Sequence, residues 1–261
     1  MPDEHSNDPP PYLRRRVSRP HPFASNDLQV VAPSPSKLTA AEQKRIPKRL
    51  VDLFSALDAR IAKAPAPFQW LPDALGGRER VVEMSRFDDR EYWHVRLVKR
   101  FGDSLTDACF GCDAITEGAV DRSVPACLAW ARETFGTINL VAEQSGTAPM
   151  GRTLREVFAR QRAFYAEAYA QQGIDADSIE DLSTALPPES AAWVSLYEAD
   201  GDWIFADIAR DETVWVGPEW TGEAATRFAV PWARAAAFVM WRMIDGGAIR
   251  PVDLRVLAAK G

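Results

Sequence analysis

The sequence has few of the residues that most often build catalytic and metal sites. Only 3 of its 261 residues are cysteine and only 3 are histidine. His5 and His21 lie in a proline-rich N-terminal segment, which leaves His94 for the folded region. The sequence also lacks a P-loop, the Gly-x-Gly-x-x-Gly of dinucleotide-binding folds, the His-Glu-x-x-His of zinc proteases and the kinase motifs. Nothing in it therefore indicates nucleotide chemistry.

Long hydrophobic runs are missing as well. A membrane-spanning helix needs about 18 consecutive apolar residues, and the best candidate, residues 228–244, is interrupted by Pro231, Arg234 and Arg242. The sequence opens Met-Pro-Asp-Glu-His, without the apolar segment of a secretory signal. Three cysteines without an export signal predict reduced thiols. We therefore expect a cytoplasmic protein that does not span a membrane.

The charge balance excludes another class. The net charge is −6 and the isoelectric point is about 5.2, whereas general nucleic-acid binders neutralise phosphates with an excess of Lys and Arg. Only 6 of the 31 basic residues are lysine. Together with the abundance of alanine, this bias is typical of a GC-rich, bacterial genome.

Composition divides the chain into two parts. The first 36 residues hold 8 of the 19 prolines and almost no periodic apolar pattern. Such a segment cannot bury enough surface to offset the entropy lost on ordering. We expect a disordered tail over residues 1–36 and a globular region over 37–261. The loop-like residues 145–151 are a candidate boundary within that region.

The first half of the globular region combines helices with a hairpin. Thr39 and Glu42 form a candidate capping box, and a helical apolar face follows, made by Leu50, Leu53, Phe54, Leu57 and Ile61. Residues 80–87 and 91–101 are typical of two hairpin strands. We expect a loop where the two neighbouring cysteines lie, then a helix from Ser123 through Phe135 and a short strand near residues 137–143.

The second half contains the clearest strand signal. A long helix over 153–172 and a short acidic helix precede three strands at 192–198, 202–209 and 213–217, which tight turns join into a meander. A helix from Thr221 or Gly222 to Asp245 and a final short strand or turn over 248–257 follow. Hairpins separated by helices predict an α+β fold with antiparallel sheet.

Cys109 and Cys112 raise the question of a metal or redox centre. A structural zinc site needs about four ligands, and Cys109, Cys112, Cys127 and His94 would supply a Cys3His set. A redox pair would instead need a helix N-terminus to lower a thiol pKa, and Asp107 and Asp113 oppose a thiolate here. The third interpretation, which we favour, is that these are small buried residues and that no cofactor is bound.

Aromatic and acidic residues crowd the second half. Six of the 9 tryptophans fall within fifty residues, at positions 193, 203, 215, 220, 232 and 241. Interleaved acids and exposed aromatic rings are typical of protein interfaces. We therefore expect that this part of the chain contacts a protein partner that has a basic surface. The residues expected to form the contact are Trp203, Trp215, Asp200, Asp202, Asp211 and Glu212. The alternative is that the rings fill the core and the acids solvate strand ends.

Two classes of function follow. The first hypothesis is a non-catalytic regulatory protein, such as an inhibitor, an immunity-type protein or an assembly factor, that acts by contacting another protein. The second is an enzyme with a Cys/His centre, with zinc or a reactive thiol. An enzyme built on carboxylates and arginine alone is a further alternative, because such sites leave no motif.

Overall fold

A computed structural model describes residues 38–75, 78–87, 90–101, 104–112, 120–139, 147–171, 186–199, 201–217, 225–245 and 249–259. The tail expected over residues 1–36 lies outside this part of the chain, as does the segment 174–185, for which we expected an acidic helix.

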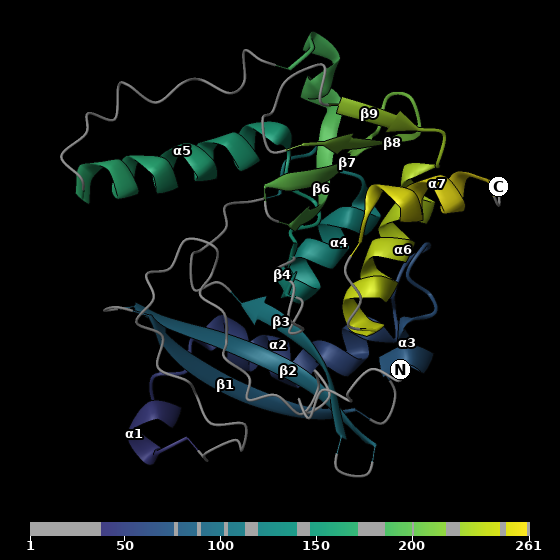
Figure 1. The fold of residues 1–261 in the computed structure, drawn as a ribbon. Coiled ribbons are helices and arrows are strands. Elements are labelled where there is room, and N and C mark those ends of the chain that lie inside the picture. Colours follow the sequence, from purple (N-terminus) through teal and green to yellow (C-terminus); the bar gives the residue numbers. More distant parts are fainter. Residues whose placement is uncertain are drawn as a thin grey trace, which may run out of the picture.

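Within these residues, nine antiparallel strands form one sheet in sequence order (Figure 1). The long strands β1 (Glu79–Phe87), β2 (Arg90–Phe101) and β3 (Ser104–Cys112) form one end of the sheet. The short strands β4 (Thr137–Asn139) and β5 (Thr147–Ala148) connect them to β6 (Trp193–Ala199), β7 (Asp202–Asp207), β8 (Glu212–Val216) and β9 (Ala225–Phe228). The predicted α+β class with antiparallel sheet is confirmed.

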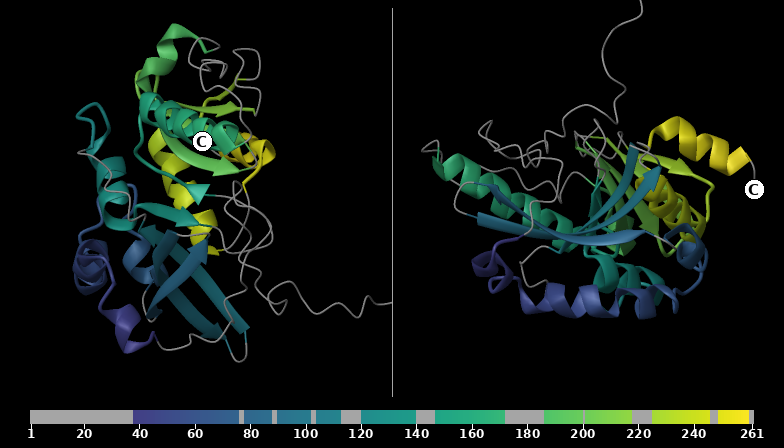
Figure 2. Two further views of the ribbon diagram at one scale, coloured as in Figure 1. Left: turned by 90° about the vertical axis from the view of Figure 1, so that its left-hand side faces the viewer. Right: turned by 90° about the horizontal axis from the view of Figure 1, so that it is seen from below.

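Seven α-helices accompany the sheet in the described residues: α1 (Ala40–Gln43), α2 (Lys48–Ile61), α3 (Leu71–Leu75), α4 (Ala126–Phe135), α5 (Leu154–Gln171), α6 (Trp232–Asp245) and α7 (Pro251–Ala259). A 3-10 helix, η3 (Pro188–Ala192), leads into β6. Helix α2 contacts β2 and α4, and Figure 2 shows α2 running below the long strands. Helix α6 contacts every strand from β3 to β8, so it connects the two ends of the sheet.

Two hydrophobic cores lie on the two faces of the meander β6–β7–β8. Along β7, Ile204 and Ala206 join the main core with α2, α4 and α6, whereas Trp203 and Phe205 join a smaller core with the start of α5. This alternation follows from the two-residue repeat of a strand. Because both faces are covered, the meander reads in the sequence as a nearly continuous apolar run.

The register of β6 shifts between Ser195 and Tyr197. A bulge of this kind inserts one extra residue in a strand and changes which face the following side chains occupy. As a result, the consecutive residues Leu196 and Tyr197 both lie in the main core. The candidate boundary at 145–151 contains β5, which pairs with β4 on one side and β6 on the other.

Several local predictions are confirmed. The Thr39–Glu42 capping box forms, with hydrogen bonds in both directions. Leu50, Leu53, Leu57 and Ile61 of α2 are buried as the helical pattern predicted.

Three predictions of elements are wrong. The cysteine segment predicted as a loop is the end of strand β3. The helix predicted to begin at residue 221 or 222 starts at Trp232, because β9 precedes it and Pro231 interrupts the backbone hydrogen bonding. The predicted final strand or turn is helix α7, whose first turn contains Pro251 and is capped by Asp253, which accepts a hydrogen bond from the Arg250 amide at 2.8 Å.

Candidate functional site

The Cys/His set is spread over two strands and a helix. His94 on β2 pairs in register with Gly111 on β3, and on the same two strands Cys109 pairs with Arg96 and Cys112 with Trp93. Extended backbone advances about 3.3 Å per residue, so the backbone at Cys109 and Cys112 does not form the turn that zinc clips use. The pair also does not lie at a helix N-terminus, where a thiol pKa would be lowered.

Cys127 lies on α4 as a free, half-buried thiol. Burial raises its pKa above the ordinary value, which disfavours the thiolate that metals and nucleophilic reactions require. Among the side chains that the structure describes, no three His, Cys, Asp or Glu residues gather as metal ligands. The side chains of His94, Cys109 and Cys112 lie outside that set, so the zinc centre stays a prediction.

The acids expected to form one partner surface fall into two groups. Asp202 begins β7, next to the turn that contains Asp200, which lies outside the described residues. Asp211 and Glu212 follow the other end of β7. A strand of six residues is about 17 Å long, so the meander places the two groups at opposite ends and does not combine them into one patch.

The two tryptophans expected at that surface are buried. Trp215 is 6% exposed and belongs to the main core, and Trp203 is 8% exposed and stacks on Phe205 in the smaller core, with ring centroids 5.7 Å apart. Their buried strand neighbours lie in the opposite core, Ile204 in the main core and Val214 and Val216 in the smaller one. At these two positions the structure agrees with the alternative interpretation, in which the tryptophan rings fill the core.

An ion-pair network occupies the β7–β8 end of the meander. Asp207, 1% exposed, accepts hydrogen bonds from Arg227 Nη1 at 2.7 Å, from Trp193 Nε1 at 3.2 Å and from the Arg210 amide at 3.1 Å. Arg227 also pairs with Glu212 at 3.2 Å and lies over the Trp193 ring, 5.7 Å from its centroid. The network ties β7, β8 and β9 together across the sheet.

Burial and hydrogen bonding act on Asp207 in opposite directions. Burial alone raises the pKa of its carboxyl, but the hydrogen bonds from Arg227, Arg210 and Trp193 outweigh this effect, so its pKa lies below the ordinary value. The carboxylate is therefore ionised at neutral pH with its acceptor oxygens occupied. Such a group stabilises the fold and is not available as a general base.

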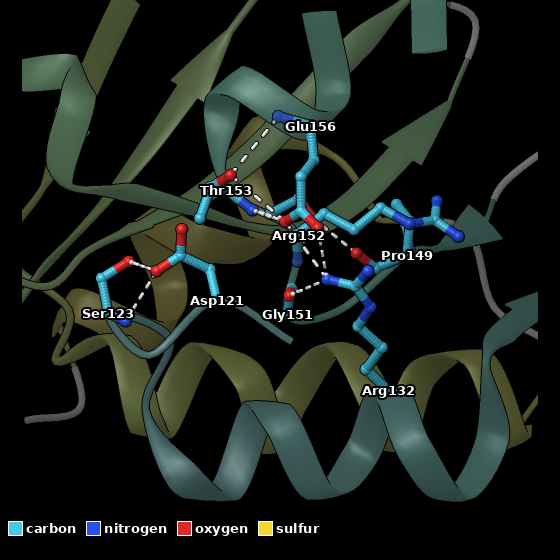
Figure 3. A network of polar contacts seen from close by, with 9 residues as sticks. Asp121, Ser123, Arg132, Pro149, Gly151, Arg152, Thr153 and Glu156 are labelled. Atoms are coloured by element: carbon cyan, nitrogen blue, oxygen red, sulfur yellow. Dashed lines mark hydrogen bonds and ion pairs between the residues drawn. The ribbon is translucent and has the colours of Figure 1, made fainter. Parts of the chain in front are cut away.

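A second network joins α4 to the start of α5 (Figure 3). Arg132, 4% exposed, donates to the Gly151 carbonyl at 3.0 Å and to both carboxylate oxygens of Glu156 at 3.0 and 3.1 Å. Glu156 also closes a capping box with Thr153, whose amide donates to it at 2.8 Å and whose hydroxyl accepts from the Glu156 amide at 3.3 Å. The sequence signal Thr-x-x-Glu was present at this helix start but was missed in the prediction.

Ser195 is a buried hydroxyl beside this network. It is 0% exposed, donates to the Pro149 carbonyl and accepts from the Arg152 amide at 3.3 Å. The backbones of Ser195, Gly151 and Arg152 exchange two further hydrogen bonds, at 3.1 and 2.8 Å. These contacts fix the loop before α5 against β6. The Ser195 hydroxyl donates its proton to a backbone carbonyl, whereas a nucleophilic serine needs a base that accepts this proton.

One aromatic ring of the described part of the chain lies on the surface. Among the described residues, Trp241 on α6 is the tryptophan with an exposed side chain, at 45%. Its ring lies 6.0 Å from that of Phe238, which packs against the main core, and the Arg242 guanidinium lies 5.7 Å from its centroid. We call Phe238, Trp241 and Arg242 the α6 aromatic surface. The sequence showed the abundance of tryptophan but not which ring would be exposed.

Comparisons with protein families, curated proteins and solved structures found no match to this chain. In the part of the chain that the structure describes, none of the helices combines the length and the apolar character that crossing a bilayer requires.

Proposed function

We propose that this chain is a regulatory binding protein that acts by contacting another protein through the α6 aromatic surface. The exposed ring of Trp241 carries the proposal. Tryptophan and arginine are the residues most enriched among those that dominate binding energy at interfaces. A cytoplasmic location, as expected from the sequence, belongs to the same proposal.

The geometry of α6 suits a pre-organised contact. The helix is fixed by its opposite face, where Ala235, Val239, Met240 and Met243 are buried in the main core. Phe238 supports the Trp241 ring from one side. A ring held in this way loses little rotational freedom on binding, which favours affinity.

The acidic residues contribute a second, smaller element to this proposal. Asp211 is exposed at the β7–β8 turn, and Glu212 next to it is shared with Arg227. We propose that Asp211 and Glu212 make a separate contact with basic residues of the partner, because exposed charges mainly set association rate and specificity.

The test places a photo-crosslinking amino acid at position 241 and, as a matched control, at Val256 on α7, which is 49% exposed. Both proteins are expressed in the native host, and crosslinked partners are identified by mass spectrometry. The candidate partner is then purified, and its affinity is measured for the unmodified chain, for Trp241→Ala and for Val256→Ala.

We expect one protein to crosslink in stoichiometric yield at position 241 and not at 256. Trp241→Ala should weaken its binding about 30-fold or more, as at other central aromatic contacts, and Val256→Ala should change it less than about threefold. Equal yields at the two positions, crosslinking only to a second copy of this chain, or unchanged affinity of Trp241→Ala would contradict the proposal.

A further inference from the structure

The two faces of strands β1, β2 and β3 carry different kinds of residue. On β2, Trp93, Val95 and Leu97 are buried in the main core. Helices α2, α4 and α6, which contact β2 or β3, place their own buried residues in the same core. Because successive residues of a strand alternate between its faces, His94 takes a position on the face opposite to this core.

The register of the sheet brings two further chemical groups to that face. Glu83 on β1 lies directly opposite His94, and on β3 the residue opposite His94 is Gly111. Cys109 lies two residues before Gly111 on the same strand, so it shares the face of His94 and is diagonal to it. Opposite positions have Cβ atoms about 4.5–5.5 Å apart, and diagonal positions lie about 7–8 Å apart. Glu83, His94 and Cys109 are therefore neighbours, in that order, across three strands.

The register gives the two cysteines of β3 different surroundings. Cys112 is opposite Trp93, which is buried in the main core, so Cys112 takes a position on the core face. Cys109 takes a position on the other face, with His94. Of the two thiols, Cys109 is thus the candidate for chemistry that needs an imidazole, and Cys112 is a matched control.

Two further positions on this face suit the approach of a small molecule. Gly111 adds no side chain between His94 and Cys109, and a glycine within a strand often marks a place where a ligand comes close. On the next strand, Asn139 of β4 lies directly opposite Cys109. An amide at this position can donate to an oxygen that gains negative charge during a reaction at Cys109.

The fixed charges near Cys109 act in opposite directions. Arg96 of β2 lies directly opposite Cys109 and favours a thiolate, whereas Asp107, two residues away on β3, opposes one. Because these two effects offset each other, the group that accepts the thiol proton decides how reactive the thiol is.

We propose that Cys109 is a nucleophilic thiol, that His94 accepts its proton and that Glu83 is a positioning residue for His94. The order of carboxylate, imidazole and thiol is the one that an activated cysteine needs, with a third group that orients the base. The substrates are esters or thioesters, because Asn139 supplies a donor for the oxyanion of an acyl transfer. The site is independent of the α6 aromatic surface, since it lies on other residues.

The reaction is a substitution at the acyl carbon in two steps. The Cys109 sulfur attacks the carbonyl carbon and forms a thioester while His94 takes the thiol proton, and the bond to the leaving group breaks as that group receives the proton from His94. Water then attacks the thioester, and His94 takes a proton from the water. The C–S bond breaks as this proton returns to the Cys109 sulfur and the carboxylic acid is released. Neither step needs an oxidant or a reductant.

The first experiment alkylates the full chain with iodoacetamide and follows each cysteine by mass spectrometry, after EDTA has removed any metal that could mask a thiol. The native chain is compared with the urea-unfolded chain, so no variant is needed. An ordinary thiol is only about 3% ionised at pH 7. Full ionisation would raise the rate up to about 30-fold, and the lower nucleophilicity of a less basic thiolate reduces this gain to about threefold or more.

We therefore expect native Cys109 to react at least about threefold faster at pH 7 than in the unfolded chain. The pH of its half-maximal rate should lie at least about one pH unit lower. Cys112 should react no faster in the native chain than in the unfolded chain. His94→Gln should return the half-maximal pH of Cys109 to that of the unfolded chain. Glu83→Gln should move it part of the way, whereas loss of a merely structural residue would change the rate equally at every pH.

The second experiment uses p-nitrophenyl acetate as the acyl donor. We expect the acetyl group to be found on Cys109 by mass spectrometry. Release of p-nitrophenolate should be lost in Cys109→Ser and retained in Cys112→Ser. Near-ultraviolet circular dichroism checks that both variants keep the native fold.

Three outcomes would overturn the inference. These are a native Cys109 that reacts with the same pH dependence as in the unfolded chain, a His94→Gln variant whose Cys109 behaves as in the unmodified chain, and equal release of p-nitrophenolate by the two serine variants. Trp241→Ala should leave both reactions unchanged, which separates this test from that of the proposed function.

Discussion

Replacing Asp207 by alanine is expected to lower the free energy of unfolding by about 3 kcal/mol. The substitution leaves the Trp193 Nε1–H without an acceptor in a side chain that is 1% exposed, which costs about 1–2 kcal/mol. Arg227 loses its shortest contact but keeps Glu212 and is 30% exposed, so its loss is nearer to 1 kcal/mol than to the 3–5 kcal/mol of a fully buried pair. The Arg210 amide turns to water at little cost.

Urea denaturation followed by tryptophan fluorescence measures this change, and for a chain of this size it corresponds to a melting temperature lower by about 6–12 °C. The control is Glu212→Ala, which removes a partly exposed partner of the same Arg227 and should cost less than about 1 kcal/mol. If Asp207→Ala is as stable as the unmodified chain to within about 0.5 kcal/mol, or no less stable than Glu212→Ala, the buried carboxylate does not hold the meander together.

The same network predicts a dependence on pH. The pKa of Asp207 is lower in the folded chain than its ordinary value, so its stabilising effect is complete above the unfolded-state pKa of about 4 and is lost as the pH falls through the folded-state value. The stability difference between the unmodified chain and Asp207→Asn should therefore be constant from about pH 5 to 8 and shrink below pH 4. A difference that grows on acidification would contradict this assignment.

Three further predictions concern other positions. Gly151→Ala should cost about 2–4 kcal/mol, because the residue has a φ of +80° and a Cβ would lie 2.6 Å from a backbone oxygen of α4; chemical denaturation measures it, and a change under about 1 kcal/mol would refute the argument. Thr153→Ala should cost about 1 kcal/mol through loss of the cap, and the same assay would show no change if α5 starts without it. If the sequence-based zinc hypothesis is right, replacing Cys109 and Cys112 by serine should abolish zinc that co-purifies with the chain, as measured by atomic absorption; an unmodified chain without zinc would end that hypothesis.

The parts of the fold that the sequence predicted are those where one local pattern determines the outcome. The Thr39–Glu42 box needs four residues, and the buried stripe of α2 needs one helical period. The meander was recognisable because β-branched and aromatic residues stood between an Asp-Gly turn and a second short turn. In each case the signal lies within one continuous stretch of the sequence.

The sequence-based predictions fail where the structure of a segment depends on contacts with distant parts of the chain. Helix α7 has Pro and Asp at its start, yet its sequence is equally compatible with a strand. The packing of Leu254 in the main core, which the local sequence does not show, favours the helix. Residues 225–228 become β9 because β8 offers a free edge for pairing. Which of the crowded tryptophans remains exposed depends on which face of the meander or of α6 is covered, and composition does not contain that information.

The position of α6 in the sequence also affects how the chain is made. Strands β1 to β3 are complete by residue 112, but α6, which contacts β3 to β8, ends at residue 245. At ribosomal speeds of about 5–20 residues per second, the interval between them lasts on the order of 10 s. Helix α2, which precedes these strands in the chain, can already cover β2 during that time. The side of β3 and of the following strands that contacts α6 stays exposed to solvent, so the nascent chain presents apolar surface there until its last helices are made.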